Sequence, residues 1–471
     1  RSFKNVGTAR KTAARPGSPT TSPKKRIRII GADLNTARRG NTERNKKNFP
    51  RGIFSVFFVR GMIELSCVKR AALPVLFLLT LICAEARLSP LAPPPEWSKL
   101  NSFQQTITRA EFLALLDKVY APGGAWKGTI TVHDDAAIIK TRPGQQPFLL
   151  RFAPSREAAK AVPTYWRSRA DLPAEEPGKP LAGLKIALDP GHLGGYWAKM
   201  EERWFQIGNS KPVTEGDMTL YVAKLIADRL EPLGAQVFLT RTKASPVTTL
   251  RPGQLKKTAA ASLEDKGAAL TESSLQRESE RLFYRVGEIR RRGKLVNESI
   301  RPDLVICLHF NAEEWGDARN PKLVDLNHLH FLITGAMSAE ELTYEDQRYD
   351  MLVKLLNRSY TEEAALTNVL AKKMQDATGL PPYSYSGSTA IRVNSNPYVW
   401  ARNLLANRLY VCPVVYVEPY VMNNRNVFAR IQAGDYEGRR NFGGTMRKSI
   451  FREYADAVAD GVLTYYSGRA L

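Results

Sequence analysis

Cysteine is scarce in this sequence, which has only four cysteines among 471 residues. Cys67 and Cys83 lie in a hydrophobic N-terminal segment, whereas Cys307 and Cys412 lie in apolar runs typical of buried strands. A disulfide between Cys307 and Cys412 is one possibility in an exported protein. We expect two buried free thiols instead, because a chain of this length can bury a sizeable core without the bridges that small secreted scaffolds need.

The sequence also lacks an apolar run of comfortable membrane-spanning length around its hydrophobic segment at 71–83. That segment follows Lys69 and Arg70 and precedes Ala-Glu-Ala at 84–86, which is the pattern of a secretory signal peptide. We therefore assign residues 62–86 to a signal peptide. We expect an exported protein of the periplasm or cell envelope, with no stable membrane span after cleavage.

Acidic residues are few at the front of the chain. Residues 1–61 hold 16 Lys and Arg against Asp33 and Glu43, so they carry +14 of the formal net charge of +23. They read as a disordered basic extension, and we expect translation to begin at Met62. The alternative is a genuine extension such as a transit peptide. No nucleic-acid recognition motif accompanies the charge, which precedes a secretion signal, so we expect no nucleic-acid partner.

Two parts follow the signal, separated by a Pro- and Glu-rich linker at 170–180. Residues 96–165 predict a small α+β module, with a helix capped by Thr108 and Glu111 and a hairpin around His133. Residues 181–466 predict the main domain. Its apolar runs and its periodic helix at 216–233 favour an α/β fold with a central, mostly parallel sheet flanked by helices.

Polar residues follow three apolar runs of the main domain at the point where each run stops. His192 follows the run at 184–188, His309 follows 304–308, and Glu418 follows 414–417, while Glu215 opens the periodic helix. Ligands gather at the carboxyl ends of strands in open α/β sheets. Two His and one Glu are a common zinc set, and a further Glu can act as a base.

These motifs, in order, resemble the zinc-dependent N-acetylmuramoyl-L-alanine amidases of the bacterial cell wall. The resemblance rests on the segments at 189–192, 215–220, 239–242, 309–312 and 413–418 and covers roughly residues 180–466. It implies Zn²⁺ held by His192, Glu215 and His309, with Glu418 as the base. It also implies hydrolysis of the amide bond between N-acetylmuramic acid and L-alanine, with peptidoglycan as the partner.

Several alternatives stay open from sequence alone. The same site would suit a zinc peptidase that cuts within the stem peptide, and a related fold without activity would be a peptidoglycan-binding module. Asp189 or a backbone carbonyl is expected to orient the His192 imidazole. His328 and His330 face one side of a strand, where we expect structural roles and weigh a metal or substrate contact. The basic run at 290–292 is expected to face solvent. The oligomeric state is not predicted.

Overall fold

The computed structural model describes residues 87–468, and the fold is given for that part of the chain. The basic extension at 1–61 and the assigned signal peptide at 62–86 lie outside the described residues. Within the described part, no helix is both long enough and apolar enough to cross a membrane.

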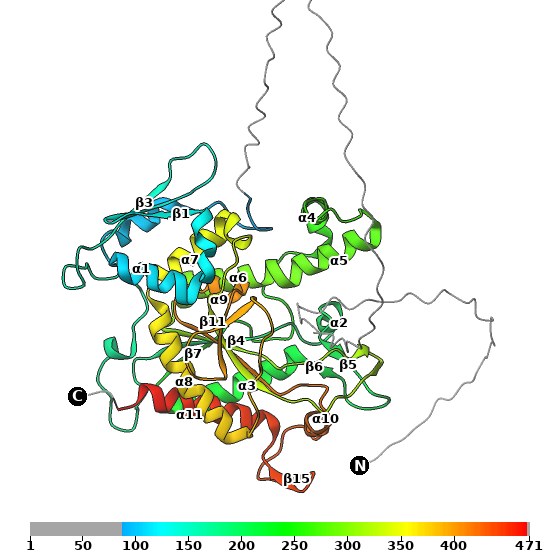
Figure 1. The fold of residues 1–471 in the computed structure, drawn as a ribbon. Helices are drawn as coiled ribbons and strands as arrows, with labels where there is room; N and C mark the ends of the chain where they lie inside the picture. The colour runs from blue at the N-terminus through cyan, green and yellow to red at the C-terminus, as the bar shows by residue number, and fades with distance from the viewer. Residues whose placement is uncertain (1–86, 469–471) are drawn as a thin grey trace, which may run out of the picture. The chain divides into compact units, whose positions relative to one another are not determined.

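A seven-stranded sheet lies at the centre of the main domain (Figure 1). Its order is β12-β13-β11-β14-β8-β4-β7, and four of the six neighbouring pairs are parallel. The strands are β4 (Lys185–Pro190), β7 (Gln236–Leu239), β8 (Leu304–Leu308), β11 (Leu329–Thr334), β12 (Ala390–Arg392), β13 (Val399–Arg402) and β14 (Val414–Pro419). The predicted α/β fold with a mostly parallel sheet is confirmed.

Helices cover both faces of this sheet, which explains why β8 and β11 are buried along their whole length. On one face α3, α8 and α11 pack against the strands and one another, and on the other face lie α6 and α9 (Figure 1). These helices are α3 (Glu215–Leu230), α6 (Glu288–Lys294), α8 (Ser359–Thr378), α9 (Leu405–Leu409) and α11 (Ile450–Tyr466). Cys307 and Cys412 are buried and free, as expected.

The direction of β11 brings a fourth strand end to the site. β4, β8 and β14 are parallel, so their carboxyl ends lie at one edge of the sheet. β11 runs antiparallel to β14, and its first residue, Leu329, pairs with Pro419 at the end of β14. The start of β11 therefore lies at the same edge as the carboxyl ends of β4, β8 and β14.

The small module has the predicted elements. Thr108 and Glu111 form a capping box at the start of α1 (Arg109–Leu115), and three antiparallel strands follow, with His133 in the turn between the first two. The strands are β1 (Ile130–Val132), β2 (Ala136–Ile139) and β3 (Phe148–Arg151). The predicted helix cap and hairpin are confirmed.

The core of this module continues into α7 (Glu345–Leu356) of the main domain. Phe112 and Leu150 belong to the same buried cluster as Leu352 and Leu355, and all four side chains are fully buried. The Trp97 indole also donates a hydrogen bond of 2.8 Å to the buried Glu345 carboxylate. Separate folding of residues 96–165 stays a prediction, and its test must take this shared core into account.

Shortening the chain to begin at Thr164 is expected to lower stability without unfolding the sheet. That start keeps Arg167, which pairs with the buried Asp303, but removes the apolar partners of α7. Each newly exposed Leu or Met costs about 1.5–3 kcal/mol, so the unfolding free energy in urea should fall by several kcal/mol. A double substitution on α7, Leu352→Ser with Leu355→Ser, should recover part of that loss. An unchanged unfolding midpoint in the shortened chain would show that the shared core contributes nothing.

The remaining elements lie around this framework. α4 and α5 form a helical hairpin (Figure 1), and α5 continues through one π-helical turn, 283–287, into α6. The others are α2 (Trp197–Met200), α4 (Lys256–Asp265), α5 (Glu272–Leu282), α10 (Arg425–Gln432), β5 (Trp204–Phe205), β6 (Val213–Thr214), β9 (Gly316–Asp317), β10 (Asn320–Pro321), β15 (Arg440–Phe442) and β16 (Thr445–Arg447).

Candidate active site

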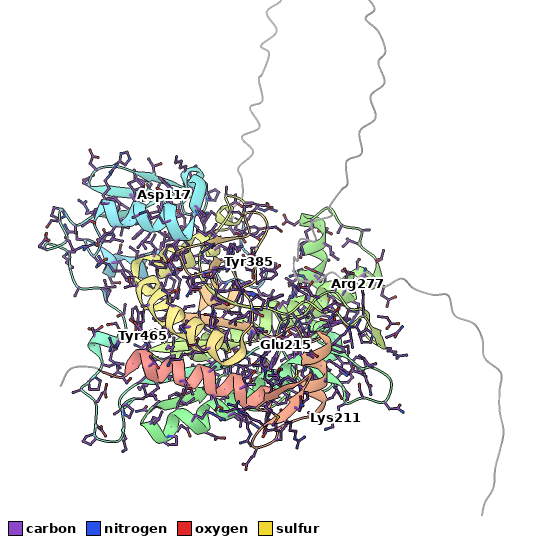
Figure 2. The ribbon with its side chains drawn as sticks, turned by 60° about the horizontal axis from the view of Figure 1, so that its bottom comes forward. Asp117, Lys211, Glu215, Arg277, Tyr385 and Tyr465 are labelled. Atoms are coloured by element: carbon purple, nitrogen blue, oxygen red, sulfur yellow. The ribbon has the colours of Figure 1, made fainter. Side chains whose placement is uncertain are left out.

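Three of the predicted site residues converge at the carboxyl edge of the sheet. His192 follows β4, His309 follows β8, and Glu215, which Figure 2 labels, is the first residue of α3. One possible ligand atom from each lies within 4.8 Å of the other two. Among the described residues, this is the one group of three or more His, Cys, Asp or Glu whose geometry would suit a metal ion.

Glu215 lies between the two imidazoles. Its Oε2 is 3.4 Å from His192 Nε2, and its Oε1 is 3.3 Å from His309 Nδ1. Oε1 also accepts a hydrogen bond of 3.1 Å from the Phe310 amide. Burial favours the neutral acid, but the electrostatic influence of the His192 imidazole, the hydrogen bond from His309 and the charge of Arg203 hold the pKa of Glu215 below its ordinary value. The carboxylate is therefore ionised and able to act as a ligand.

Close approach of the chain to His309 requires glycine at position 191. A Cβ added there would lie 2.3 Å from His309 Cε1, which no side chain tolerates. The imidazole is held from the other side by Tyr416 of β14, whose ring is stacked on it at 5.0 Å. Glycine at position 191 therefore allows the backbone after β4 to lie directly against the His309 ring that follows β8.

Glu201 orients His192, a role that the sequence analysis gave to Asp189 or a backbone carbonyl. The Glu201 Oε1 lies 2.7 Å from His192 Nδ1, and its Oε2 accepts a hydrogen bond of 2.6 Å from the Leu193 amide. A carboxylate can only accept, so Nδ1 carries the proton and the lone pair of Nε2 faces Glu215. Burial lowers the pKa of His192 well below its ordinary value, which keeps the imidazole neutral.

Among the described residues, Asp189 does not bond to His192, so the prediction that it orients this imidazole was wrong. It instead supports the site loop, which we define as residues 190–193 at the end of β4. It is 4% exposed and accepts hydrogen bonds from Thr240 at 2.5 Å, Tyr410 at 2.6 Å and Arg292 at 2.9 Å. Burial raises its pKa, but the Arg292 charge and these hydrogen bonds leave it below the ordinary value. The prediction that 290–292 faces solvent was wrong for Arg292, which is 3% exposed because it pairs with Asp189.

Arg292→Gln should destabilise the fold strongly, because it leaves the buried Asp189 carboxylate without its cation. Removing one partner of a buried ion pair costs about 3–5 kcal/mol. The neighbouring Arg291 is exposed, and Arg291→Gln should change stability by less than about 0.5 kcal/mol. Urea unfolding of the two variants measures the difference. Equal stability of both would show that the pair with Asp189 does not support the loop.

Glu418 lies beside His309 but outside the group of possible ligands. In the parallel pair of β14 and β8, Val417 is in register with Leu308, so Glu418 and His309 follow at the same level. Burial, the largest cause, and the nearby Glu215 charge raise the pKa of Glu418 to about 7, against the lowering influence of His309. A carboxylate with this pKa can accept a proton near neutral pH and release it again.

The segment between His192 and Glu215 forms a wall of the site. Arg203 places its Nε 3.4 Å from His192 Nε2 and 3.3 Å from Glu215 Oε2. The strand β5 follows, and Phe205 is fully buried against Trp315 at 5.0 Å. Phe205 thereby packs this segment against the domain.

His328 and His330 lie beyond Glu418 and do not join His192, Glu215 and His309. His330 is in register with Glu418, and its ring is 6.0 Å from that of His328. His328 Nε2 is 3.5 Å from Glu313 Oε1. The two imidazoles do not form part of a three-ligand group within the described residues.

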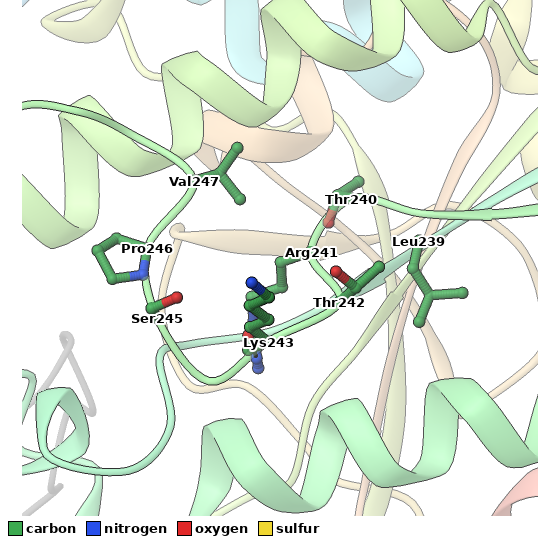
Figure 3. A pocket seen from close by; sticks show the side chains of 8 residues that line it. All are labelled: Leu239, Thr240, Arg241, Thr242, Lys243, Ser245, Pro246 and Val247. Carbon is green, nitrogen blue, oxygen red and sulfur yellow. Dashed lines mark hydrogen bonds between the residues drawn. The ribbon is translucent and has the colours of Figure 1, made fainter.

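The end of β7 and the turn after it form a pocket (Figure 3). It is lined by Leu239, Thr240, Arg241, Thr242, Lys243, Ser245, Pro246 and Val247. None of the possible metal ligands lines it. The Arg241 guanidinium is buried and donates to the backbone carbonyls of Pro190 at 3.2 Å and Gly191 at 3.3 Å, and also to that of Gly216. Arg241 therefore holds the site loop against α3.

Comparison with known proteins gives one family and a set of solved structures. A family model described as N-acetylmuramoyl-L-alanine amidase matches residues 186–440. No curated protein matches. The apo form of the N-acetylmuramyl-L-alanine amidase Ami1 from Mycobacterium abscessus aligns with 18% identity and a TM-score of 0.33, covering 61% of this chain and 100% of that one. AmiC2 of Nostoc punctiforme aligns with 16% identity and a TM-score of 0.32, covering 60% and 98%.

Proposed function

Because the chain belongs to the N-acetylmuramoyl-L-alanine amidase family, we propose that it hydrolyses the amide bond between N-acetylmuramic acid and L-alanine in peptidoglycan. His192, Glu215 and His309 would hold a zinc ion for this reaction, and Glu418 would be the base. The observation that supports the proposal best is the placement of three possible ligand atoms within 4.8 Å of one another, with Glu418 on the next strand beside His309.

The residues present fit zinc. Two imidazole nitrogens and one carboxylate oxygen form a ligand set used by catalytic zinc sites, which leave one position for water or substrate. Glu201 holds the proton of His192 on Nδ1 and so directs the Nε2 lone pair toward the other ligands. Cys307 is no competing ligand, since burial raises the pKa of its thiol well above the ordinary value.

The chain's own residues would handle the proton. When bound, zinc supplies a Lewis acid for the amide carbonyl and lowers the pKa of water to about 7. Glu418 would accept the proton of the attacking water at its carboxylate and then donate it to the departing amine nitrogen of L-alanine. Tyr416 holds the ring of His309 while this happens, and Arg203 lies where it can meet negative charge that develops on the substrate.

Digestion of purified sacculi tests this function. An amidase releases intact stem peptides that begin with L-alanine and leaves glycan without peptides. A zinc peptidase would leave cut stems attached to the glycan, and a binding module would release nothing. Removal of zinc with a chelator should abolish release, and added zinc should restore it. Cut stems, or activity that survives complete zinc removal, would contradict the proposal.

Glu201→Gln should weaken zinc binding while leaving the fold intact. An amide at this position can present its NH₂ group to His192 Nδ1 and no longer fixes the proton there, and loss of such an orienting carboxylate costs roughly 10- to 100-fold in metal affinity. Competition with a chromophoric chelator measures the zinc dissociation constant. Glu202→Gln is the matched control, because no bond joins the adjacent Glu202 side chain to His192 among the described contacts. Equal affinities in the two variants would remove the orienting role.

We also propose the division of the chain and its location. Residues 181–466 would be the catalytic domain, which contains the matched region 186–440, and residues 96–165 an accessory module that is dispensable for hydrolysis of small muropeptides. Since peptidoglycan lies outside the cytoplasmic membrane, the enzyme would be exported to the periplasm or cell envelope. Cell fractionation of the tagged full chain tests that location.

A further inference from the structure

Three neighbouring strands, β8, β14 and β11, each place a polar side chain at the same edge of the sheet, and the third lies one strand beyond the proposed base. His309 and Glu418 lie at the same level on β8 and β14, and His330 of β11 is in register with Glu418. The proposed function uses the first two residues and leaves His330 without a role. His330 is 4% exposed, so it does not itself face solvent.

Hydrogen bonds fix the proton of His330. The Asn311 Nδ2 donates to the Glu418 carbonyl at 3.3 Å and lies 3.3 Å from His330 Nδ1. An amide nitrogen donates two hydrogens and accepts none, so His330 Nδ1 must accept. In a neutral imidazole the proton then sits on Nε2, which is 2.9 Å from the Tyr385 hydroxyl. Burial lowers the pKa of His330 well below its ordinary value, in agreement with the neutral ring.

In this arrangement the Tyr385 hydroxyl accepts a hydrogen bond from His330, so its own proton is not used in that bond. The guanidinium carbon of Arg402 is 5.5 Å from the Tyr385 ring centre. Neither Arg402 nor Glu418 can accept in this arrangement: a guanidinium has no acceptor, and no bond joins Tyr385 to Glu418 within the described residues. The phenol proton is therefore available to a bound molecule.

Arg402 adds an unneutralised charge to the same place. Its side chain is half-buried, and no carboxylate pairs with it in the part of the chain that the structure describes. Its charge is felt at Glu418, where it favours the ionised form. Tyr383 packs against both His330 at 5.1 Å and Tyr385 at 4.8 Å, which holds the hydroxyl in position. Two donors, one of them cationic, thus lie on the β11 side of the proposed base, close enough for their charges to influence one another.

We propose that Tyr385 and Arg402 form a carboxylate-binding subsite that receives an acidic group of the peptide part of the substrate. This rests on the proposed function, because it concerns the same site. A guanidinium and a phenol together suit a carboxylate, which accepts two charge-assisted hydrogen bonds, whereas a neutral sugar hydroxyl would leave the cation unpaired. Binding there would fix the peptide on the β11 side of Glu418 and align the scissile amide with the base.

The test compares two muropeptides that are identical except that the peptide carboxylates are free in one and amidated in the other. The wild-type enzyme should have a kcat/KM roughly 10- to 100-fold higher for the free acid, the factor expected for a charge-assisted hydrogen bond. Arg402→Gln should remove this preference by raising KM for the free acid, whereas any change in kcat that comes from the influence of Arg402 on Glu418 should be the same for both substrates. Tyr385→Phe should remove part of it. Arg392→Gln is the control and should keep the full preference, because Arg392 is exposed on the edge strand β12.

Equilibrium binding provides a readout that does not depend on turnover. In the Glu418→Gln background, the free-acid muropeptide should bind roughly 10- to 100-fold more weakly once Arg402→Gln is added. Hydrolysis of both muropeptides with no preference, or an equal loss on both substrates in Arg402→Gln, would overturn the subsite and leave the proposed function standing. A folded, zinc-loaded wild type that cleaves neither would overturn the proposed function, and the subsite with it.

Discussion

Glu418→Gln is expected to lower kcat roughly 10²- to 10⁴-fold, the usual contribution of general acid–base catalysis, while the zinc content stays near one ion per chain. Glutamine keeps the shape of the side chain and removes the proton acceptor. Glu418 lies beside His309 but outside the three-ligand group, so the metal should not be affected. Metal analysis and muropeptide hydrolysis on the same sample measure both quantities.

The pH dependence of kcat provides a second test of the role of Glu418. Glu418 must be ionised to accept a proton, so kcat of the wild type should fall as the pH drops through the pKa of Glu418. Burial and Glu215 raise that pKa to about 7 in the protein alone, and a bound cation lowers it. The acidic limb of the profile should therefore lie at or below about pH 7, and Glu418→Gln should lack it.

Exposed Glu314 supplies the control for this substitution, since it lies on the nearby loop that follows His309. Glu314→Gln should keep the wild-type rate, zinc content and pH profile. If Glu418→Gln lost its zinc while folded, Glu418 would be a ligand and the assignment of the base would fail. If it kept nearly full activity, the proton route given above would be wrong.

His309→Ala should lose both zinc and activity. Among the described residues His309 is one of three possible ligands, and two remaining ligands do not make a stable catalytic zinc site. The metal content of the purified variant should fall toward zero, and hydrolysis should fall to the background of a zinc-free sample. His133→Ala is the control, because His133 lies exposed in the hairpin of the small module. Retention of one firmly bound zinc by His309→Ala would remove His309 from the ligand set.

The circular dichroism spectra of these variants separate loss of metal from loss of fold. His309 contributes its stacking on Tyr416 to the local structure, but the strand β8 that precedes it is buried along its whole length and paired on both sides. The sheet should therefore persist in His309→Ala. A spectrum without sheet signal would mean that the experiment reports unfolding, and His309→Gln would then replace it.

The three apolar runs that end in His192, His309 and Glu418 made the sheet and its site edge predictable. An almost continuous apolar run is the pattern of a strand buried on both faces, and parallel neighbours place their carboxyl ends at one edge. Glu215 was predictable in the same way, because it begins a helix with a clear apolar stripe. These residues carry their signal in the local sequence, and the structure brings His192, Glu215 and His309 together.

Glu201 and Arg292 were beyond prediction because their partners are set by tertiary packing. Glu201 lies in an irregular polar segment without periodicity, and only the return of that segment toward β4 brings it to His192. Arg292 follows two other arginines in a charged helix, a pattern that indicates a solvated face. It is buried because Asp189, about a hundred residues earlier, requires a cation. No pattern within either segment carries that information.

Short strands were missed for a related reason. β12 and β13 have three and four residues and lie in or next to a Pro-, Ser- and Gly-rich stretch, where turn signals outweigh β propensity. The sheet creates them, since Ile391 and Ala401 pair only once Ala401 is aligned with Ile333 of β11. As a result Arg402 and Tyr385 had no predicted place, although both come to lie near Glu418.

The reversed direction of β11 has a consequence for how such an enzyme can diversify. The possible metal ligands lie on segments associated with β4, α3 and β8, whereas His330, Tyr385 and Arg402 lie on or beyond β11, across β14 from them. The connections that carry Tyr385 and lead into β11 can thus change in length or composition while the ligand geometry stays fixed. Substrate preference and hydrolytic chemistry would then depend on separate parts of the chain. The residues that set substrate preference could change in evolution while the possible metal ligands stay the same.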